Sequence, residues 1–468
     1  MKNISSLKWM SISSIIVAVV QFIQGILLAK IMGVEFYGFI ATILIIIAFT
    51  FTIIDLGYYN NFVKKRISFL TAFNFFLPIS LVISLISIFA IPFILDLDNN
   101  IVILQQIIFI YIFFYSLSQV YFIFFQRTGL FYIISIVEIV SITLSFIYFL
   151  YKIYIDDMNL VNYFITFSIF GFTRFILFFI FSLKNKNLFY KNKNKNKNLF
   201  IFLKSGFSFA KYQILERFLN FMITRSEQII IVSILGSKFF GIYIFAWNLV
   251  IQPITKVIPI FTKILYPNLC KIKDRYKVKE IVILNLRSIK VISYPILFGI
   301  SLVSKQFIVL FFDKSWYDTI VILKVLAILY IFKVTFDVLN ATLLAQNYSK
   351  ISMYWVAIQV IINSLSLLIY LKFIGGINIL LPISCSIIIL KIIELFIYIK
   401  IFNFNIKELV MDDLKIIFSL FFIYVSTFQL VDNISILNFV IIIIISIVIY
   451  LISLSQIYKT NPLKLIKI

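Results

Sequence analysis

The chain has 468 residues, of which 62% are hydrophobic and only 13% are charged. A soluble domain carries roughly 25% charged residues, so this composition excludes a water-solvated globular fold and indicates an integral membrane protein. The absence of histidine removes the serine, cysteine and zinc hydrolase schemes that need an imidazole. The two cysteines lie in different segments and predict neither a disulfide framework nor a metal site. In a membrane protein the formal net charge of +23 first reports topology, not binding to nucleic acid.

Apolar runs of about 20 residues, the length that crosses a bilayer as a helix, recur along the whole chain. The first run, Trp9 to Ile31, is too long for the core of a signal peptide and lacks a small-residue cleavage site, so we expect a transmembrane helix there. The pattern predicts fourteen helices, with twelve as the alternative if the last pair does not span. They cover residues 9–31, 37–59, 68–95, 101–125, 130–151, 160–183, 207–236, 239–267, 287–312, 319–345, 351–373, 377–401, 413–431 and 435–457.

Every second connection between these helices is basic, and the intervening connections carry most of the acids. The basic ones begin with Lys64, Lys65 and Arg66, whereas Asp96 and Asp98 occupy the next connection. Cytoplasmic loops of membrane proteins carry an excess of Lys and Arg. The alternation therefore predicts cytoplasmic termini and an even number of crossings.

The sequence indicates two related halves, separated by a low-complexity basic connection that begins at Lys184. "IMGVEFYG", from Ile31, and "ILGSKFFG", from Ile234, share two glycines and a phenylalanine in register. Six predicted helices separate these motifs, so the halves have the same orientation and form a parallel repeat. We predict two pseudo-symmetric six-helix lobes around a central cavity, followed by a C-terminal helix pair. The predicted boundaries are 1–183 for the N-lobe, 184–204 for a cytoplasmic linker, 205–401 for the C-lobe and 402–468 for the pair.

The predicted seventh helix contains "ERFLNFMITRSEQ", a charged stretch within an apolar segment. Projected at about 100° per residue, its polar residues gather on roughly one third of the circumference. This face consists of Gln213, Glu216, Arg217, Asn220, Thr224, Glu227 and Gln228, with Arg225 near its margin. One charge at the bilayer centre costs about 2.5–3.5 kcal/mol, so the face cannot contact lipid. We predict that it lines a hydrated cavity.

Other predicted helices carry fainter polar faces. Gln21 and Gln24 share one side of the first helix, and the eighth helix has Asn248, Gln252 and Lys256 along one face. Lys391 and Glu394, three residues apart, also share a helix face, and we interpret them as a neutralising tie, not as a ligand site.

A cavity that mixes guanidinium, ammonium and amide groups suits a ligand with a phosphate or pyrophosphate and many hydroxyls. Guanidinium binds the anion in a forked geometry, and Asn and Gln bind hydroxyls. The acids Glu216, Glu227 and Asp337 are then candidates for coupling to a proton or sodium gradient. This assignment follows from residue type.

"LLAKIMGVEFYGFIA", residues 27–41, and "IIDLGYYNNFVKKR", residues 53–66, resemble the start of bacterial polysaccharide flippases of the Wzx type. Those proteins share a superfamily, called MOP, with MATE multidrug extruders and peptidoglycan lipid flippases. The resemblance covers the chain in length, spacing and two-lobe layout, although Lys30 stands where relatives often have arginine. It implies transfer of undecaprenyl-diphosphate-linked oligosaccharides to the outer face of the bacterial inner membrane by alternating access, for O-antigen, lipopolysaccharide or capsule synthesis. It also implies a cationic lumen, to which Arg217, Arg225, Lys256 and Arg174 would contribute.

The expected partners are this lipid-linked oligosaccharide, membrane lipids, a polysaccharide polymerase and a chain-length regulator, with no nucleic acid and no cofactor. The predicted substrate-binding residues are Gln21, Gln24, Arg174, Gln213, Arg217, Asn220, Thr224, Arg225, Gln228, Asn248, Gln252 and Lys256. Two alternatives stay open. A drug exporter of the same fold would use a more apolar or acidic cavity, and a polymerase or ligase usually carries a large external loop, which is not predicted here.

Overall fold

The computed structural model describes residues 2–55, 69–90, 101–185, 199–270, 272, 274–374, 378–431 and 434–458. Within these ranges the regular secondary structure is entirely helical, and eleven helices are long and apolar enough to cross a membrane. The prediction of an all-α polytopic membrane protein is thereby confirmed. The chain divides into two compact units, Met1–Met222 and Ile223–Ile468, which we describe separately. Most of the predicted linker, residues 186–198, lies outside the described ranges.

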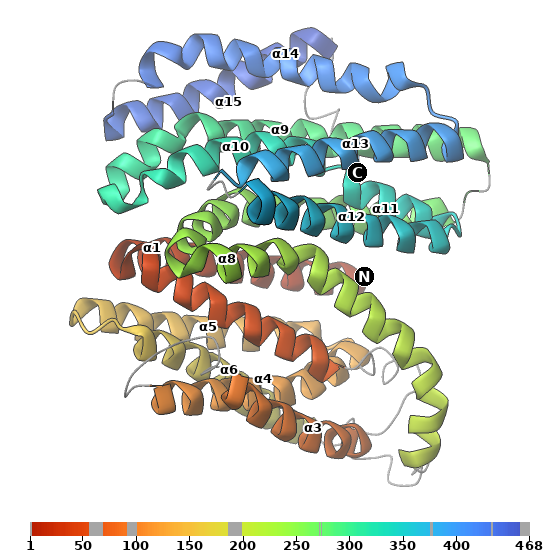
Figure 1. Ribbon diagram of the computed structural model, residues 1–468. Coiled ribbons are helices and arrows are strands. Elements are labelled where there is room, and N and C mark those ends of the chain that lie inside the picture. The colour runs from red at the N-terminus through yellow and green to blue at the C-terminus, as the bar shows by residue number, and fades with distance from the viewer. Residues whose placement is uncertain are drawn as a thin grey trace. The chain divides into compact units, whose positions relative to one another are not determined.

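Among the described residues, the first unit has five complete helices and the beginning of a sixth (Figure 1). They are α1 (Lys2–Asp55), α3 (Phe69–Ala90), α4 (Ile101–Thr128), α5 (Phe131–Tyr154), α6 (Leu160–Lys184) and the first part of α8 (Leu199–Cys270). Buried aromatic rings of α3, α4 and α6, including Phe76, Phe125 and Phe178, form its core. Helices α4 and α6 approach closely at Gly171, where an added Cβ would lie 3.1 Å from Tyr111. The missing side chain of Gly171 therefore allows this packing.

The described part of the second unit has the rest of α8 and seven further α-helices, which lie side by side in Figure 1. They are α9 (Arg275–Phe311), α10 (Asp318–Lys333), α11 (Phe336–Ala345), α12 (Ser349–Ile369), α13 (Leu380–Phe402), α14 (Ile406–Val431) and α15 (Ile436–Tyr458). A 3₁₀ turn, Lys314–Trp316, precedes α10, and a π-helical turn, Tyr370–Ile374, follows α12. Helices α10 and α11 are separated by a two-residue break at Val334 and Thr335, within one predicted span.

The two glycine motifs adopt the same local structure. Helix α1 is interrupted at Gly33, with φ 72° and ψ 176°, and helix α8 is interrupted at Gly236, with φ 77° and ψ 175°. Positive φ is strained for a side chain with a Cβ and open to glycine. Each long element is therefore two helices joined by a sharp glycine turn, as the sequence motif predicted for both halves.

The C-terminal helix pair is attached to α9 by ion pairs. Arg287 Nε lies 2.9 Å from Asp412 Oδ2, and Lys290 Nζ lies 2.8 Å from Asp413 Oδ1. The Tyr294 hydroxyl also donates to Asp413 at 2.6 Å. Helix α14 begins at Ile406 rather than at residue 413, because its charged first turns pack against α9 instead of forming a loop. We refer to these contacts as the α9–α14 clamp.

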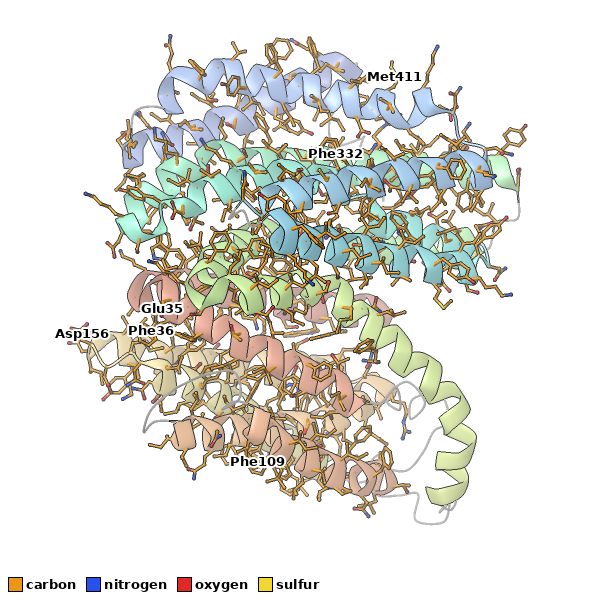
Figure 2. The ribbon with its side chains drawn as sticks, viewed as in Figure 1. Glu35, Phe36, Phe109, Asp156, Phe332 and Met411 are labelled. Atoms are coloured by element: carbon orange, nitrogen blue, oxygen red, sulfur yellow. The ribbon has the colours of Figure 1, made fainter. Side chains whose placement is uncertain are left out.

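The connection between α5 and α6 is ordered by Asp157. Its carboxylate accepts hydrogen bonds from Lys152 at 2.6 Å and from the Asn162 amide at 3.2 Å. The hydrogen bond and charge of Lys152 hold the pKa of Asp157 below its ordinary value. In Figure 2, Asp156 lies at the same end of the first unit as Glu35, just after the Gly33 turn. The Gly33 turn and the α5–α6 connection thus share one end of the first unit.

Candidate functional site

The first unit contains a cavity of about 320 Å³ with one charged side chain in its wall. Three helices build it: the end of α1, the second half of α4 and the first part of α8. The lining residues are Phe51, Thr52, Ile54, Tyr115, Ser116, Gln119 and Arg217. A guanidinium group thus shares a small space with hydroxyl, amide and aromatic groups. We call this space the Arg217 cavity.

Arg174 lies behind the wall of the Arg217 cavity. Its Nε and Nη2 atoms lie 2.9 and 2.7 Å from Glu138 Oε1, and Nη1 donates to Ser118. Its Cζ atom lies 4.7 Å from the centre of the Tyr115 ring, within the range of a cation–π contact. The side chain is only 2% exposed. Arg174 therefore joins α4, α5 and α6 and supports Tyr115, while its charge is compensated inside the unit.

The polar face of α8 continues into the second unit. Arg225 Nη1 donates to Gln228 Oε1 at 2.7 Å. The Gln228 side chain is fully buried, and its Nε2 has no hydrogen-bond partner among the described residues. An amide left without a partner at this depth costs about 1–3 kcal/mol, which a polar ligand or water would offset. This part of α8 is therefore suited to contact something polar.

Glu227 lies in a polar cluster that both arms of α8 and helix α10 form. It accepts a hydrogen bond of 3.3 Å from the Tyr243 hydroxyl, across the Gly236 turn. Nearby, Trp247 donates to the Tyr330 hydroxyl at 3.1 Å, and Lys333 Nζ lies 4.9 Å from the centre of the Tyr330 ring. Glu227 and Lys333 are close enough to interact electrostatically. A buried carboxylate and an ammonium group thus belong to one cluster with two tyrosines.

The remaining predicted residues occupy varied environments. Gln24 is buried, and its amide lies 3.5 Å from Thr166 Oγ1. Exposed side chains are those of Gln21, Asn220, Thr224, Lys256 and Asp337, and half-buried ones are those of Asn248 and Gln252. The side chains of Gln213 and Glu216 lie outside the described part of the chain, although the backbone there is helical.

The tie predicted between Lys391 and Glu394 is confirmed. Lys391 Nζ lies 2.7 Å from Glu394 Oε2 and 2.8 Å from Thr335 Oγ1, at the break between α10 and α11. The Thr335 hydroxyl in turn donates to Glu394 at 2.9 Å. The pair thus fixes the broken helix to α13.

Sequence reasoning missed most of the Arg217 cavity. Thr52, Ser116 and Gln119 are isolated polar residues in strongly apolar helices, and no periodic face marks them. The segment "YSLSQ" in α4, with three hydroxyl groups and an amide in five residues, was the available signal. This segment indicates a polar patch on α4 but does not show that α1 and α8 complete the cavity.

The sequence is similar to those of known polysaccharide biosynthesis proteins. A family model described as "Polysaccharide biosynthesis protein" matches residues 27–321. The Bacillus subtilis teichuronic acid biosynthesis protein TuaB is 24% identical over 376 residues, covering 78% of this chain and 75% of that protein. An uncharacterized membrane protein from the cps region of Klebsiella pneumoniae is 24% identical over 372 residues, covering 77% of this chain and 75% of that protein.

Two solved structures show the fold. The lipid II flippase MurJ, in an inward closed conformation, has a TM-score of 0.71 with 18% identity and covers 96% of this chain and 98% of its own. An outward-facing MATE multidrug resistance transporter of the MOP superfamily has a TM-score of 0.55 with 11% identity. The match covers 88% of this chain and 95% of the transporter. At such identities the likeness is one of architecture.

Proposed function

Since the chain belongs to the Wzx-like polysaccharide biosynthesis family of the MOP superfamily, we propose that it flips lipid-linked oligosaccharides across a bacterial cytoplasmic membrane. Such proteins are membrane transporters and generally not enzymes. The proposed substrate is an undecaprenyl-diphosphate-linked repeat unit, carried from the cytoplasmic to the outer face by alternating access. A polysaccharide polymerase and a chain-length regulator would act on the product.

The Arg217 cavity carries this proposal. A diphosphate needs forked, always-charged donors, and the guanidinium of Arg217 supplies one. Sugar hydroxyls need groups that both donate and accept, as Thr52, Ser116 and Gln119 do. A cavity for lipophilic cations would instead be apolar or acidic. The chemistry of the wall thus favours an anionic, hydroxyl-rich ligand.

From the second unit we propose the basic residues Arg225 and Lys256 and the amide of Gln228 as further substrate-binding groups. The buried Gln228 amide, which lacks a partner among the described residues, supports a polar ligand there. For coupling to a proton or sodium gradient we propose Glu216, Glu227 and Asp337. Glu227 is supported best, because its electrostatic environment includes Lys333 and the Tyr243 hydroxyl.

We propose fourteen crossings with cytoplasmic termini. Two of the eleven candidate spans, Ile12–Ile54 and Arg217–Pro259, have 43 residues each, about twice the length that crosses a bilayer. A glycine turn divides each of them, so each supplies two crossings. Adding α14, whose 26 residues are long enough to span, gives fourteen. Two six-helix lobes and a C-terminal pair fit this count.

The test is leaflet-resolved measurement of lipid-linked oligosaccharides in a deletion strain that carries variants of the chain. We expect complete units to accumulate at the cytoplasmic face without the protein. Arg217→Ala should reduce delivery to the outer face about tenfold or more, since it removes the charged donor proposed for the diphosphate. Arg217→Lys should be intermediate, because lysine lacks the fork.

The matched control is Lys350→Ala, which removes an exposed basic residue at the start of α12. This variant should transport normally. Normal delivery by an Arg217→Ala protein that still inserts would remove this residue from the mechanism. Unpolymerised units at the outer face of the deletion strain would instead indicate a polymerase or ligase, and unchanged glycolipids with increased drug sensitivity would indicate an exporter.

A further inference from the structure

A second cavity, of about 550 Å³, lies in the second unit at the ends of three helices. Its walls come from the Gly236 turn of α8, the first turn of α10 and the beginning of α13. The lining residues are Leu235, Lys238, Phe239, Ile242, Asp318, Val321, Ile322, Asn378, Ile379 and Leu380. The volume falls within the roughly 300–1,000 Å³ typical of small-molecule sites. None of these residues belongs to the predicted transport site.

The cavity is amphipathic. Seven of its ten lining residues are apolar, and the three polar ones are Lys238, Asp318 and Asn378. Within the described ranges, none of the three side chains makes a hydrogen bond or an ion pair with the protein. One cationic, one anionic and one amide group are therefore free to contact a ligand that has an apolar body.

The surface beside the cavity is apolar and exposed. Ile234 is 48% exposed, Val321 is 59% exposed and Leu381 is 51% exposed. Val321 itself lines the cavity, and Ile234 and Leu381 are next in sequence to the lining residues Leu235 and Leu380, so exposed apolar surface begins at the rim of the cavity. In a membrane-spanning bundle such surface is covered by acyl chains, and the ends of helices lie near the headgroups.

We propose that this cavity binds the headgroup of a zwitterionic phospholipid that has a primary ammonium group, as in phosphatidylethanolamine. Lys238 would bind the phosphate, Asp318 would accept from the ammonium group, and Asn378 would donate to an ester or phosphate oxygen. The aliphatic walls would contact the glycerol and the first acyl carbons. An anionic headgroup without an amine would place its charge beside Asp318, and a quaternary amine could not donate to that carboxylate.

This proposal is independent of transport and is tested without it. The purified, delipidated full-length chain is titrated with phosphatidylethanolamine, phosphatidylcholine or phosphatidylglycerol, and bound lipid is counted by native mass spectrometry. A charge-assisted hydrogen bond to Asp318 should favour phosphatidylethanolamine over phosphatidylcholine by about tenfold. Asp318→Asn should abolish this preference. Lys238→Gln should weaken binding of both lipids alike.

The matched controls are Asp313→Asn and Lys314→Gln, which remove exposed charges just before α10 that do not line the cavity. They should retain the preference in full. The proposal would be overturned by equal binding of the three lipids by the unmodified chain, by an unchanged preference in Asp318→Asn, or by the same loss in the control variants. Displacement of the lipid by a soluble oligosaccharide would also overturn it and assign the cavity to sugar.

Discussion

Removing Asp413 from the α9–α14 clamp should destabilise the protein more than removing Asp412. The cost of breaking a buried ion pair is set mainly by the charge left behind. Loss of Asp413 leaves Lys290, which is only 4% exposed, whereas loss of Asp412 leaves Arg287, which is 29% exposed and can reach water. We expect Asp413→Ala to lower the free energy of unfolding by about 3–5 kcal/mol. For Asp412→Ala we expect about 1–2 kcal/mol.

The assay is reversible unfolding in mixed micelles of a mild detergent and dodecyl sulfate. Replacing both members of the buried pair, as Lys290→Met with Asp413→Leu, should recover most of the loss, because no uncompensated charge remains. The reasoning is refuted if Asp412→Ala costs as much as Asp413→Ala. It is also refuted if the double variant is as unstable as Asp413→Ala alone.

Three further predictions concern local structure. Gly33→Ala and Gly236→Ala should each destabilise by about 1–3 kcal/mol, because their backbone angles lie in a region that only glycine adopts readily. An added Cβ would meet nothing within 4 Å, so the loss reports backbone strain and not a clash. Gly25→Ala, at a helical position with equal space, should be neutral or stabilising in the same unfolding assay. Gly171→Ala should destabilise by about 1–3 kcal/mol because its Cβ would press on α4, and a thermal midpoint equal to that of the unmodified chain would contradict this packing. The pKa of Asp157 is lower in the folded state than in the unfolded state. Its contribution to stability is therefore fully present above the unfolded pKa of about 3.9 and is lost only as pH falls through the lower folded pKa. Hydrogen exchange of the α5–α6 connection should accordingly change little between pH 7 and pH 5.

The sequence predicted the helices and the twin glycine motifs well, because both depend on local signals. Runs of about 20 apolar residues need no knowledge of neighbours to be recognised as spans. Gly33 and Gly236 stand at equivalent places in two similar motifs, and both have the positive φ that glycine favours. The break at Thr335 was not predicted, since no proline or glycine marks it and its hydroxyl is held by residues of α13.

The candidate site was predicted less completely, because charge patterns do not identify partners. The sequence predicts Arg174 as a cation of the lumen, but in the structure Glu138, on another helix, compensates its charge. The α9–α14 clamp went unpredicted for the same reason: Asp412 and Asp413 fall near an expected helix start, where acids are common. Only tertiary packing shows that Lys290 lies opposite them. Periodicity thus identified polar faces, and side-chain pairing separated structural charges from candidate ligands.

The buried ion pairs have an electrical consequence. Each elementary charge that moves through 100 mV of membrane potential changes energy by about 2.3 kcal/mol. Arg174 with Glu138, Lys290 with Asp413, and Lys391 with Glu394 each lie within 2.8 Å, so each cation moves together with its own carboxylate. Displacement of such a pair across the membrane carries no net charge. Voltage therefore exerts no net force on these pairs, and any voltage dependence of transport must come from other charges of the chain, from the substrate or from a coupled ion.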